Sequence, residues 1–487
     1  MSARSSLCLL ALALCGCSSM APPLERPALP VAANFPGQAV GAPAAAPVAA
    51  PEWQKFFGDE RLRQLITLAL QNNRDLRLAV LNIEQARAQF ELRRADQLPT
   101  INAGLTWARQ TPTATTLPSV YSAGVLVSAF ELDLFGRVRS LADAALAQYL
   151  ATEEARKAVQ ISLLATVANS YFALQGDEDL LRVTRQTLLT REESYRLIKL
   201  RFDNGASSLI DLRQAESLLE SARVALAQAT RQRALDENAL VLLLGQALPP
   251  DLAAAPGRPK QGSPLGGQGG HEVPSPGVSF SEKRTGALDL PLGLPSDVLL
   301  RRPDVRQAEQ QLLAANASMG AARAAFFPRI SLTGSLGSAS TELGGLFSGG
   351  LNAWSFTPQL LQPIFDAGRN QANLKVSQLN RDIAVAQYER AIQSAFREVA
   401  DALAGRATLG EQLRAQQAQL LAEQDRYRLA ELRYRSGAAS YLDALDAQRS
   451  LFAAQQAELQ VQTQYLQNGV TLYRVLGGGW TANSQTP

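Results

Sequence analysis

Short runs of alternating apolar and polar residues occur at four places in the chain. In the run 101–107, isoleucine, alanine, leucine and tryptophan are separated by asparagine, glycine and threonine. The runs 330–336 and 354–360 show the same pattern, and the run 120–134 shows it less cleanly. A period of two residues predicts strands that have one apolar face. The chain therefore carries four predicted strands.

Two much longer segments follow the period of a helix. In the second of them, apolar residues recur three and four positions apart, at Val385, Tyr388, Ile392, Phe396, Val399 and Leu403. No proline occurs from 119 to 248 or from 364 to 486, although the chain has 25 prolines. Because an interior proline breaks a helix, these gaps favour helices. A helix over 137–204 or 369–436 spans about 100 Å, longer than a globular core can use.

An internal duplication relates these segments. The stretch RFDNGASSLIDL at 201–212 recurs as RYRSGAASYLDA at 433–444, and the same offset of 232 residues maps the Gly-Arg pair at 136–137 onto 368–369. Each copy contains a helical segment, two strand-like runs and a very long helical stretch. We therefore expect repeat 1 at 60–248, a Gly- and Pro-rich linker at 249–296, repeat 2 at 297–476 and a C-terminal tail at 477–487.

Glycines mark the expected ends of the long helices. Gly205 and Gly437 suit the left-handed conformation that terminates many helices, so the chain should turn there and return as an antiparallel helix. The glycine run 477–479 is typical of a helix stop and not of a phosphate-binding loop. Three further glycines are expected to mark irregularities midway along the long helices: Gly176, Gly405 and Gly410.

The first residues have the pattern of an export signal. A positive start at Arg4 is followed by an apolar run at 9–14 and by Leu-Cys-Gly-Cys at 14–17. The last four residues resemble the lipobox of bacterial lipoproteins, which implies cleavage after residue 16 and a diacylglycerol on Cys17. An ordinary secretory signal followed by a chance cysteine is the alternative.

The mature chain would then begin with a lipidated segment at 17–59, rich in Pro and Ala and extended in its first part. Its single cysteine leaves no internal disulfide. No aspartate follows Cys17, which in lipoproteins of this kind points to the outer membrane. The net charge of +3 and the lack of basic blocks give no indication of nucleic-acid binding.

No stretch after residue 17 approaches the roughly 20 apolar residues of a spanning helix, so a membrane span would have to come from strands. Strands with one apolar and one small-polar side are typical of a barrel with lipid outside and water inside. Strands half-buried in a soluble sheet give the same pattern. Four strands cannot close a barrel, so several chains must share one: two copies would give eight strands, and three would give twelve.

Motifs for catalysis are absent from the sequence. It has no G-x-S-x-G, Walker-type loop or H-E-x-x-H, and its one histidine, His271, lies in the linker. We therefore predict no enzyme activity, no cofactor and no metal site. Two rival classes are an exported hydrolase, which lacks its catalytic groups, and a periplasmic coiled-coil scaffold, which does not need paired amphipathic strands.

Four longer motifs carry a family resemblance. They are FELDLFGR at 130–137, GLPSDVLLRRPDV at 293–305, AFFPRI at 325–330 and LDAQRSL at 445–451. Together they resemble the OprM/NodT lipoprotein branch of the TolC-type outer-membrane efflux proteins, over nearly all of the mature chain. One departure is the Gly-rich part of the linker, which looks longer than is usual in the family.

The resemblance implies a mainly helical fold with a membrane β-barrel. Three protomers, each with four strands and long helical hairpins, would form a twelve-stranded outer-membrane β-barrel continued by a twelve-helix periplasmic α-barrel. The implied function is passive export in a tripartite, RND-type multidrug efflux system. Its implied partners are a homotrimer, a periplasmic adaptor, an inner-membrane pump and outer-membrane lipid. The alternative is the outer-membrane component of type I protein secretion or another export system.

The resemblance also implies a gate at the periplasmic tip. Leu442, Asp446 and Arg449 lie at spacings of four and three on one helical face. In the family, matching residues narrow the tunnel entrance as an apolar ring, a carboxylate ring and an arginine that restrains neighbouring helices. Asp443 matches another acidic position of that entrance, and Asp211 in the first copy is a weaker candidate. Without the family, the favoured interpretation of Asp443 and Asp446 is that they are solvated charges beside a turn.

A ring of carboxylates in a narrow pore concentrates cations. The turns of the two long hairpins are the expected docking site for the adaptor. Their small residues are Gly205, Ala206, Ser207, Gly437, Ala438 and Ala439.

Overall fold

The computed structural model describes residues 20–24, 26–36, 52–109, 119–253, 295–348 and 351–478. The predicted lipidation site Cys17, most of the linker and His271 lie outside these residues. The chain divides into two compact units. Unit 1 comprises Met1–Pro30, Ala79–Arg156 and Pro303–Gln393, and unit 2 comprises Val31–Leu78, Lys157–Arg302 and Ser394–Pro487. Each unit therefore draws on both repeats.

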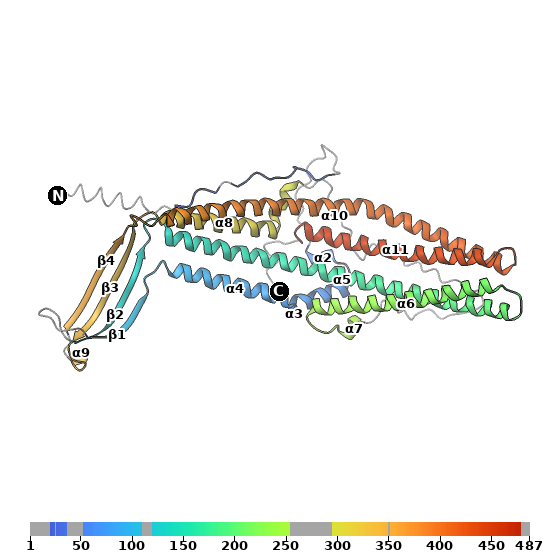
Figure 1. Cartoon of the computed structure of the whole chain (residues 1–487), viewed down its shortest axis with the longest axis horizontal. Helices are drawn as coiled ribbons and strands as arrows, with labels where there is room; N and C mark the ends of the chain where they lie inside the picture. The colour runs from blue at the N-terminus through green and yellow to red at the C-terminus, as the bar shows by residue number, and fades with distance from the viewer. Residues whose placement is uncertain are drawn as a thin grey trace. The chain divides into compact units, whose positions relative to one another are not determined.

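Helices make up most of the described chain (Figure 1). In chain order the elements are α2 (Trp53–Phe56), α3 (Glu60–Asn72), α4 (Arg74–Ala95), β1 (Ile101–Arg109), β2 (Ser119–Leu132), α5 (Arg137–Asp203), α6 (Leu209–Leu244), α7 (Pro250–Ala253), η2 (Ser296–Arg301), α8 (Pro303–Ala324), β3 (Arg329–Ser340), α9 (Gly345–Ser348), β4 (Leu351–Leu361), α10 (Arg369–Arg435) and α11 (Tyr441–Val475). Among the described residues, no helix has the length and hydropathy needed to cross a membrane.

The two longest helices occupy equivalent positions in the two copies. α5 and α10 each contain 67 residues, and each contributes residues to both units. Both follow a glycine of positive φ, Gly136 at 73° and Gly368 at 83°. At their other ends the chain turns back into α6 and α11, which run beside them as antiparallel partners (Figure 1).

The turns are built alike and confirm the predicted helix ends. Gly205 has φ 71° and Gly437 has φ 75°, a region that an L-residue rarely adopts. In the first turn, the Gly205 N–H donates to the Phe202 carbonyl at 2.9 Å and the Ala206 N–H donates to the Arg201 carbonyl at 2.7 Å. The second turn repeats both bonds. This Schellman arrangement satisfies carbonyls that the helix end leaves free.

The prediction of irregularities midway along α5 and α10 is wrong, because both helices are continuous. Two of these glycines, Gly176 and Gly405, instead allow α11 to come close within unit 2. A Cβ at Gly176 would lie 2.6 Å from the Thr463 hydroxyl, and one at Gly405 would lie 2.3 Å from the Asn468 side-chain nitrogen. Close packing of α11, and not a break in the helix, therefore requires glycine at these two positions.

The core of unit 2 lies where α3, α5, α6 and the end of α11 meet. Phe56 stacks on Tyr473 with ring centroids 4.2 Å apart, and Phe172 and Leu240 are fully buried beside them. Beyond α11, the Gly478 N–H donates to the Tyr473 carbonyl at 3.0 Å, and Gly477 has φ 94°. The predicted helix stop is therefore confirmed.

Unit 1 contains one antiparallel sheet in the order β1-β2-β3-β4, with a predicted run in each strand. The register puts most of the apolar residues of the four strands on one face, where Val125 pairs with Leu336 and Leu336 with Trp354. On the other face, hydroxyls pair across the strands: Thr106 with Ser122 at 2.6 Å and Ser335 with Ser355 at 2.7 Å. Large apolar side chains are exposed in the single chain, and 75% of Trp354 is accessible to solvent.

A β-bulge explains the poorer alternation in the second run. The pairing of β2 with β3 shifts between Val127 and Phe130. Ala129 has φ 51°, and its N–H donates to the Thr333 hydroxyl at 3.2 Å. The extra residue changes the phase of the alternation, so that Val127 before the bulge and Leu132 after it share the apolar face.

An ionic cluster joins the sheet to the helices of unit 1. Glu131 of β2 accepts two hydrogen bonds from the Arg137 guanidinium, at 2.7 and 2.6 Å, and pairs with Arg329 of β3. The rings of Phe135 and Phe327 stack beside it with centroids 4.8 Å apart. The start of α5 is thus fixed against two adjacent strands.

Two glycines that face each other allow β2 and β3 to approach closely. Gly124 and Gly337 pair directly, and a Cβ at Gly337 would lie 2.1 Å from the Ala123 carbonyl oxygen. Gly337→Ala should therefore lower the free energy of unfolding by about 1–3 kcal/mol, seen as a lower thermal midpoint in circular dichroism. Gly344→Ala is the control, since a Cβ there meets nothing within 4 Å. Equal midpoints for the two variants would contradict the close approach.

Candidate gate and docking surface

The two hairpin turns of the chain lie together at one end of unit 2, at the right in Figure 1. The Arg201 guanidinium donates to the Tyr434 hydroxyl at 2.6 Å and lies 5.1 Å from the centroid of its ring. Tyr434 and Tyr441 in turn pack against a small apolar cluster of Ile198, Leu212 and Ala215. The hairpin of the first copy is thus fixed to that of the second.

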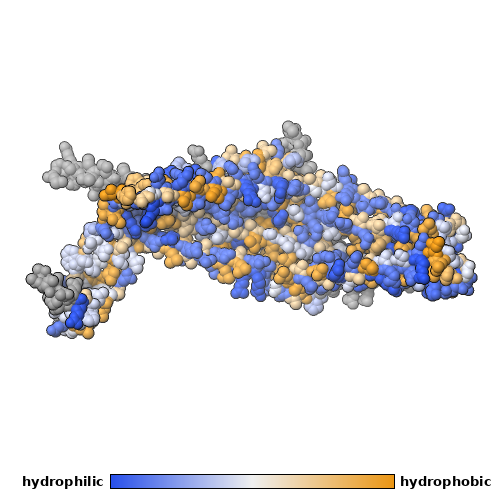
Figure 2. Space-filling view, in the orientation of Figure 1, coloured by the Kyte–Doolittle hydropathy of each residue, from blue (hydrophilic) through white to orange (hydrophobic). Residues whose placement is uncertain are grey.

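The small residues of the turns are accessible. Gly205, Ala206, Gly437 and Ala438 are exposed, and Ser207 and Ala439 are half-buried. Figure 2 shows apolar side chains gathered near this end of unit 2. Leu209, Ile210 and Leu442, which directly follow the turns, are each more than half exposed. The turns and the residues after them therefore present small and apolar groups to solvent in the single chain.

Each returning helix begins with a capping box. At α11, the Ser440 hydroxyl accepts the Asp443 N–H at 3.3 Å, and the Asp443 carboxylate accepts the Ser440 N–H at 3.3 Å and its hydroxyl at 3.0 Å. Ser208 and Asp211 form the same box at α6. The Ser208 hydroxyl lowers the pKa of Asp211, helped by its backbone N–H and by Ser207. The carboxylate of Asp443 thus has a local structural partner.

The face of α11 predicted to carry the gate points to solvent in the single chain. Leu442, Asp446 and Arg449 are exposed, whereas Ala444, Leu445, Ala447 and Gln448 are buried. Asp443, one position from Leu442, is exposed as well. Three of the predicted gate residues therefore share one accessible helical face, with Asp443 beside it.

Arg426 of α10 is a residue that the sequence reasoning missed. Its guanidinium forms an ion pair with Asp446, a second ion pair with Glu423 at 3.2 Å and a hydrogen bond to the Ser450 hydroxyl at 3.1 Å. No spacing within either helix marks this pair, because the contact depends on the register of α10 against α11.

Arg449 lies along a shallow groove of unit 2 whose other residues belong to α6. They are Leu209, Ile210, Arg213, Gln214 and Ser217. Ile210, Gln214 and Ser217 are the counterparts of Leu442, Asp446 and Arg449 in the first copy, at the same offset. The first copy therefore presents an uncharged version of the gate face.

A buried arginine lies close to this groove. Arg191 of α5 donates to the Leu218 carbonyl at 3.0 Å and to the Ser221 hydroxyl at 2.9 Å, and its guanidinium lies over the Phe452 ring. Burial, and after it the charge of Arg449, lowers the pKa of Arg191. This side chain links α5, α6 and α11 near the gate residues.

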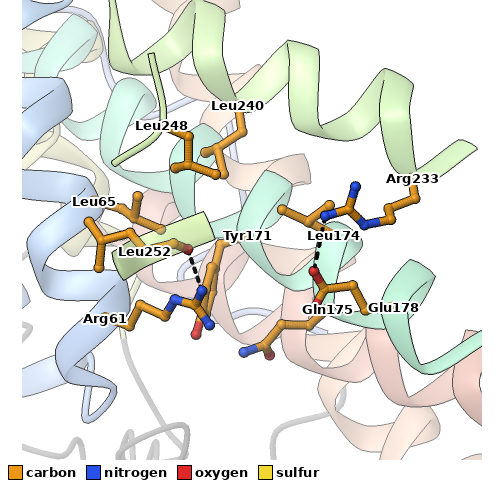
Figure 3. A pocket seen from close by; sticks show the side chains of 10 residues that line it. All are labelled: Arg61, Leu65, Tyr171, Leu174, Gln175, Glu178, Arg233, Leu240, Leu248 and Leu252. Atoms are coloured by element: carbon orange, nitrogen blue, oxygen red, sulfur yellow. Dashed lines mark hydrogen bonds and ion pairs between the residues drawn. The ribbon is translucent and has the colours of Figure 1, made fainter. Parts of the chain in front are cut away.

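A second pocket in unit 2 is a packing site. Figure 3 shows Leu248 and Leu252 closing over leucines of α3, α5 and α6, with the Arg61 guanidinium bonded to the Leu252 carbonyl. Arg233 pairs with Glu178 at 3.6 Å across its rim. Arg61 thus attaches the short helix α7, and the pair of Arg233 and Glu178 joins α6 to α5.

Comparison with known proteins identifies the chain. The model of the family described as outer membrane efflux protein matches residues 65–246 and 294–478. The chain belongs to this outer membrane efflux protein family. It is therefore an outer-membrane channel component of an efflux system, and its predicted family and function are confirmed.

Individual relatives are similar to this chain over almost its whole length. The probable efflux pump outer membrane protein TtgC of Pseudomonas putida is 47% identical over 98% of this chain and 95% of its own. Outer membrane protein OprJ of Pseudomonas aeruginosa is 45% identical over the same shares. The open-state MtrE outer membrane channel of Neisseria gonorrhoeae matches with a TM-score of 0.82 and 40% identity, over 96% of this chain and all of its own.

These likenesses confirm the mainly helical, TolC-like channel fold, and the family is one of conduits and not of enzymes. The domain boundaries, the lipidation of Cys17, the gate residues and the docking turns stay predictions.

The capping boxes give a prediction about the turns. Ser440→Ala removes the hydroxyl that caps α11, which costs about 1 kcal/mol and should speed hydrogen exchange in the first turn of α11 about fivefold. Ser440→Thr keeps a capping hydroxyl and serves as the control. Mass spectrometry of peptides covering 441–445 measures the exchange. Equal exchange rates in the two variants would contradict the role of the cap.

Proposed function

We propose that three copies of this chain form one continuous export conduit, with a twelve-stranded β-barrel in the outer membrane and a twelve-helix tube in the periplasm. The four-stranded sheet carries the proposal. Its edge strands β1 and β4 have no further strand partner among the described residues. Because open edges are not tolerated in lipid, other chains have to complete the sheet. The number three comes from the family resemblance.

The two faces of the sheet support this orientation. Exposed tryptophans and leucines on one face, among them Trp107 and Trp354, suit contact with lipid. The paired hydroxyls on the other face suit a water-filled interior. Gly104, Gly124 and Gly337 lie in one row on this second face, where the absence of side chains lets adjacent strands approach closely. In a barrel the sheet has to curve towards its inner face, and this row of glycines would allow that curvature.

The N-terminal segment supports lipid anchoring at Cys17. The carbonyl of Pro22 accepts a hydrogen bond from Asn316 at 2.9 Å, and the Met20 carbonyl accepts one from Arg323 at 3.4 Å. Arg323 lies in the last turn of α8, shortly before β3 begins. An acylated Cys17 would thus be held close to the start of the sheet, and the intact mass of extracted protein tests the modification.

Transport through such a conduit is passive, and its control lies at the tip. We assign the gate to Leu442, Asp443, Asp446 and Arg449, because they lie at the start of α11, beside the turn, and are exposed in the single chain. The accessible turns would receive a periplasmic adaptor that connects the conduit to an inner-membrane pump. Relatives named for antibiotic, toluene and solvent efflux support small organic molecules as cargo.

The gate and the conduit are tested together in planar bilayers. The purified protein should have the mass of three copies in detergent and open pores on reconstitution. Asp446→Ala should raise the single-channel conductance or the open time, since loss of the carboxylate loosens the closed tip. Asp425→Ala is the control, because Asp425 is an exposed aspartate of α10 that pairs with Arg428. A conductance unchanged by Asp446→Ala would remove the gate assignment, and the absence of pores would remove the conduit.

The docking turns are tested by cross-linking in cells. A photo-reactive residue at Ala438 should capture a periplasmic adaptor that mass spectrometry identifies as a membrane fusion protein. The same residue at Leu92, an exposed position of α4, should not capture it. Capture at Leu92 but not at Ala438 would count against docking at the turns.

A further inference from the structure

Asp446, the expected carboxylate of the entrance, is already paired within its own chain. Arg426 of α10 reaches across the hairpin to it and also contacts Glu423 on α10 and Ser450 on α11. The hydrogen bond to Asp446 raises the pKa of the Arg426 guanidinium, so this arginine stays charged. An aspartate that is paired in this way offers a pore a much weaker field than a bare carboxylate does.

This ion pair belongs to the surface of the hairpin and not to its core. The side chains of Arg426 and Asp446 are 47% and 57% exposed. Exposed ion pairs contribute little to stability, because water screens them and ordering both side chains costs entropy. Holding α10 against α11 is therefore a weak explanation for the pair.

The duplication shows that the hairpin does not need these charges. At the same offset, Ser194 and Gln214 occupy the positions of Arg426 and Asp446 in the first copy. α5 and α6 nevertheless form the same antiparallel hairpin, with the same turn and capping box. The arginine and the aspartate are thus features of the second copy alone, the copy that carries the proposed gate.

We propose that Arg426 sets the ionic selectivity of the periplasmic entrance by neutralising Asp446. This inference rests on the gate proposed above, since Asp446 has to line the pore. Three copies would then supply a ring of three Asp446–Arg426 pairs instead of three bare carboxylates. The entrance would discriminate weakly between small cations and anions, and a strong preference for cations would emerge only when Arg426 is removed.

Reversal potentials in a KCl gradient, measured on the reconstituted full-length channel, test this proposal. Arg426→Gln should raise the ratio of K⁺ to Cl⁻ permeability about twofold or more, because it exposes the carboxylates. Asp446→Asn should shift the ratio in the opposite direction. The double variant removes both charges and should return close to the wild-type value.

Arg428→Gln is the matched control, since Arg428 is an exposed arginine of the same helix, two residues away, that pairs with Asp425. It should leave the ratio unchanged. Arg426→Ser, which introduces the residue of the first copy, provides a second variant if Arg426→Gln fails to assemble.

The outcomes separate this inference from the gate assignment. A shift with Asp446→Asn and none with Arg426→Gln or Arg426→Ser overturns the role of Arg426 and leaves the gate in place. The absence of any shift with Asp446→Asn overturns the gate itself. Equal shifts with Arg426→Gln and Arg428→Gln also overturn the proposal, because an arginine that does not pair with Asp446 would then act as strongly as Arg426.

Discussion

The requirement that every backbone polar group find a hydrogen-bond partner governs this molecule. The helices satisfy it internally, and their ends satisfy it through the glycine turns and capping boxes. The sheet satisfies it only between its strands, and its two edges lack a partner strand within the described residues. In lipid that deficit is too costly to remain. The unpaired edges are thus the physical reason for proposing an assembly of several chains, in which the long helices would form the wall of a shared tube.

The duplication separates residues that build the fold from residues that give one copy its chemistry. The turn glycines and the Ser-Asp capping boxes occur in both copies and make the same contacts in each. By contrast, Asp446 is matched by Gln214 and Arg426 by Ser194. Since both hairpins form, the differing residues are not needed for the hairpin, and their charges are available for another purpose.

Residue patterns predicted the parts of the fold that depend on local periodicity. Strands, long helices and turns each follow from a repeated spacing or from a glycine at a helix end. The errors arose where a distant element decides the outcome. Close packing of α11, and not a break in the helix, requires glycine at Gly176 and Gly405. The β-bulge at Ala129, which the sequence showed only as poorer alternation, depends on the pairing of β2 with β3. Arg426 was missed because its pairing depends on the register of the two helices.

The same comparison between copies distinguishes the two aspartates of the proposed gate. Asp443 has a counterpart in Asp211, and both carboxylates accept hydrogen bonds at the start of a helix. The capping box thus accounts for Asp443 without any role in a pore. Asp446 has no acidic counterpart, and its contact crosses from α11 to an arginine that the first copy also lacks. The electrostatic role proposed for the entrance therefore suits Asp446 better than Asp443, and under the same proposal Arg426 sets how much of the Asp446 charge the pore experiences.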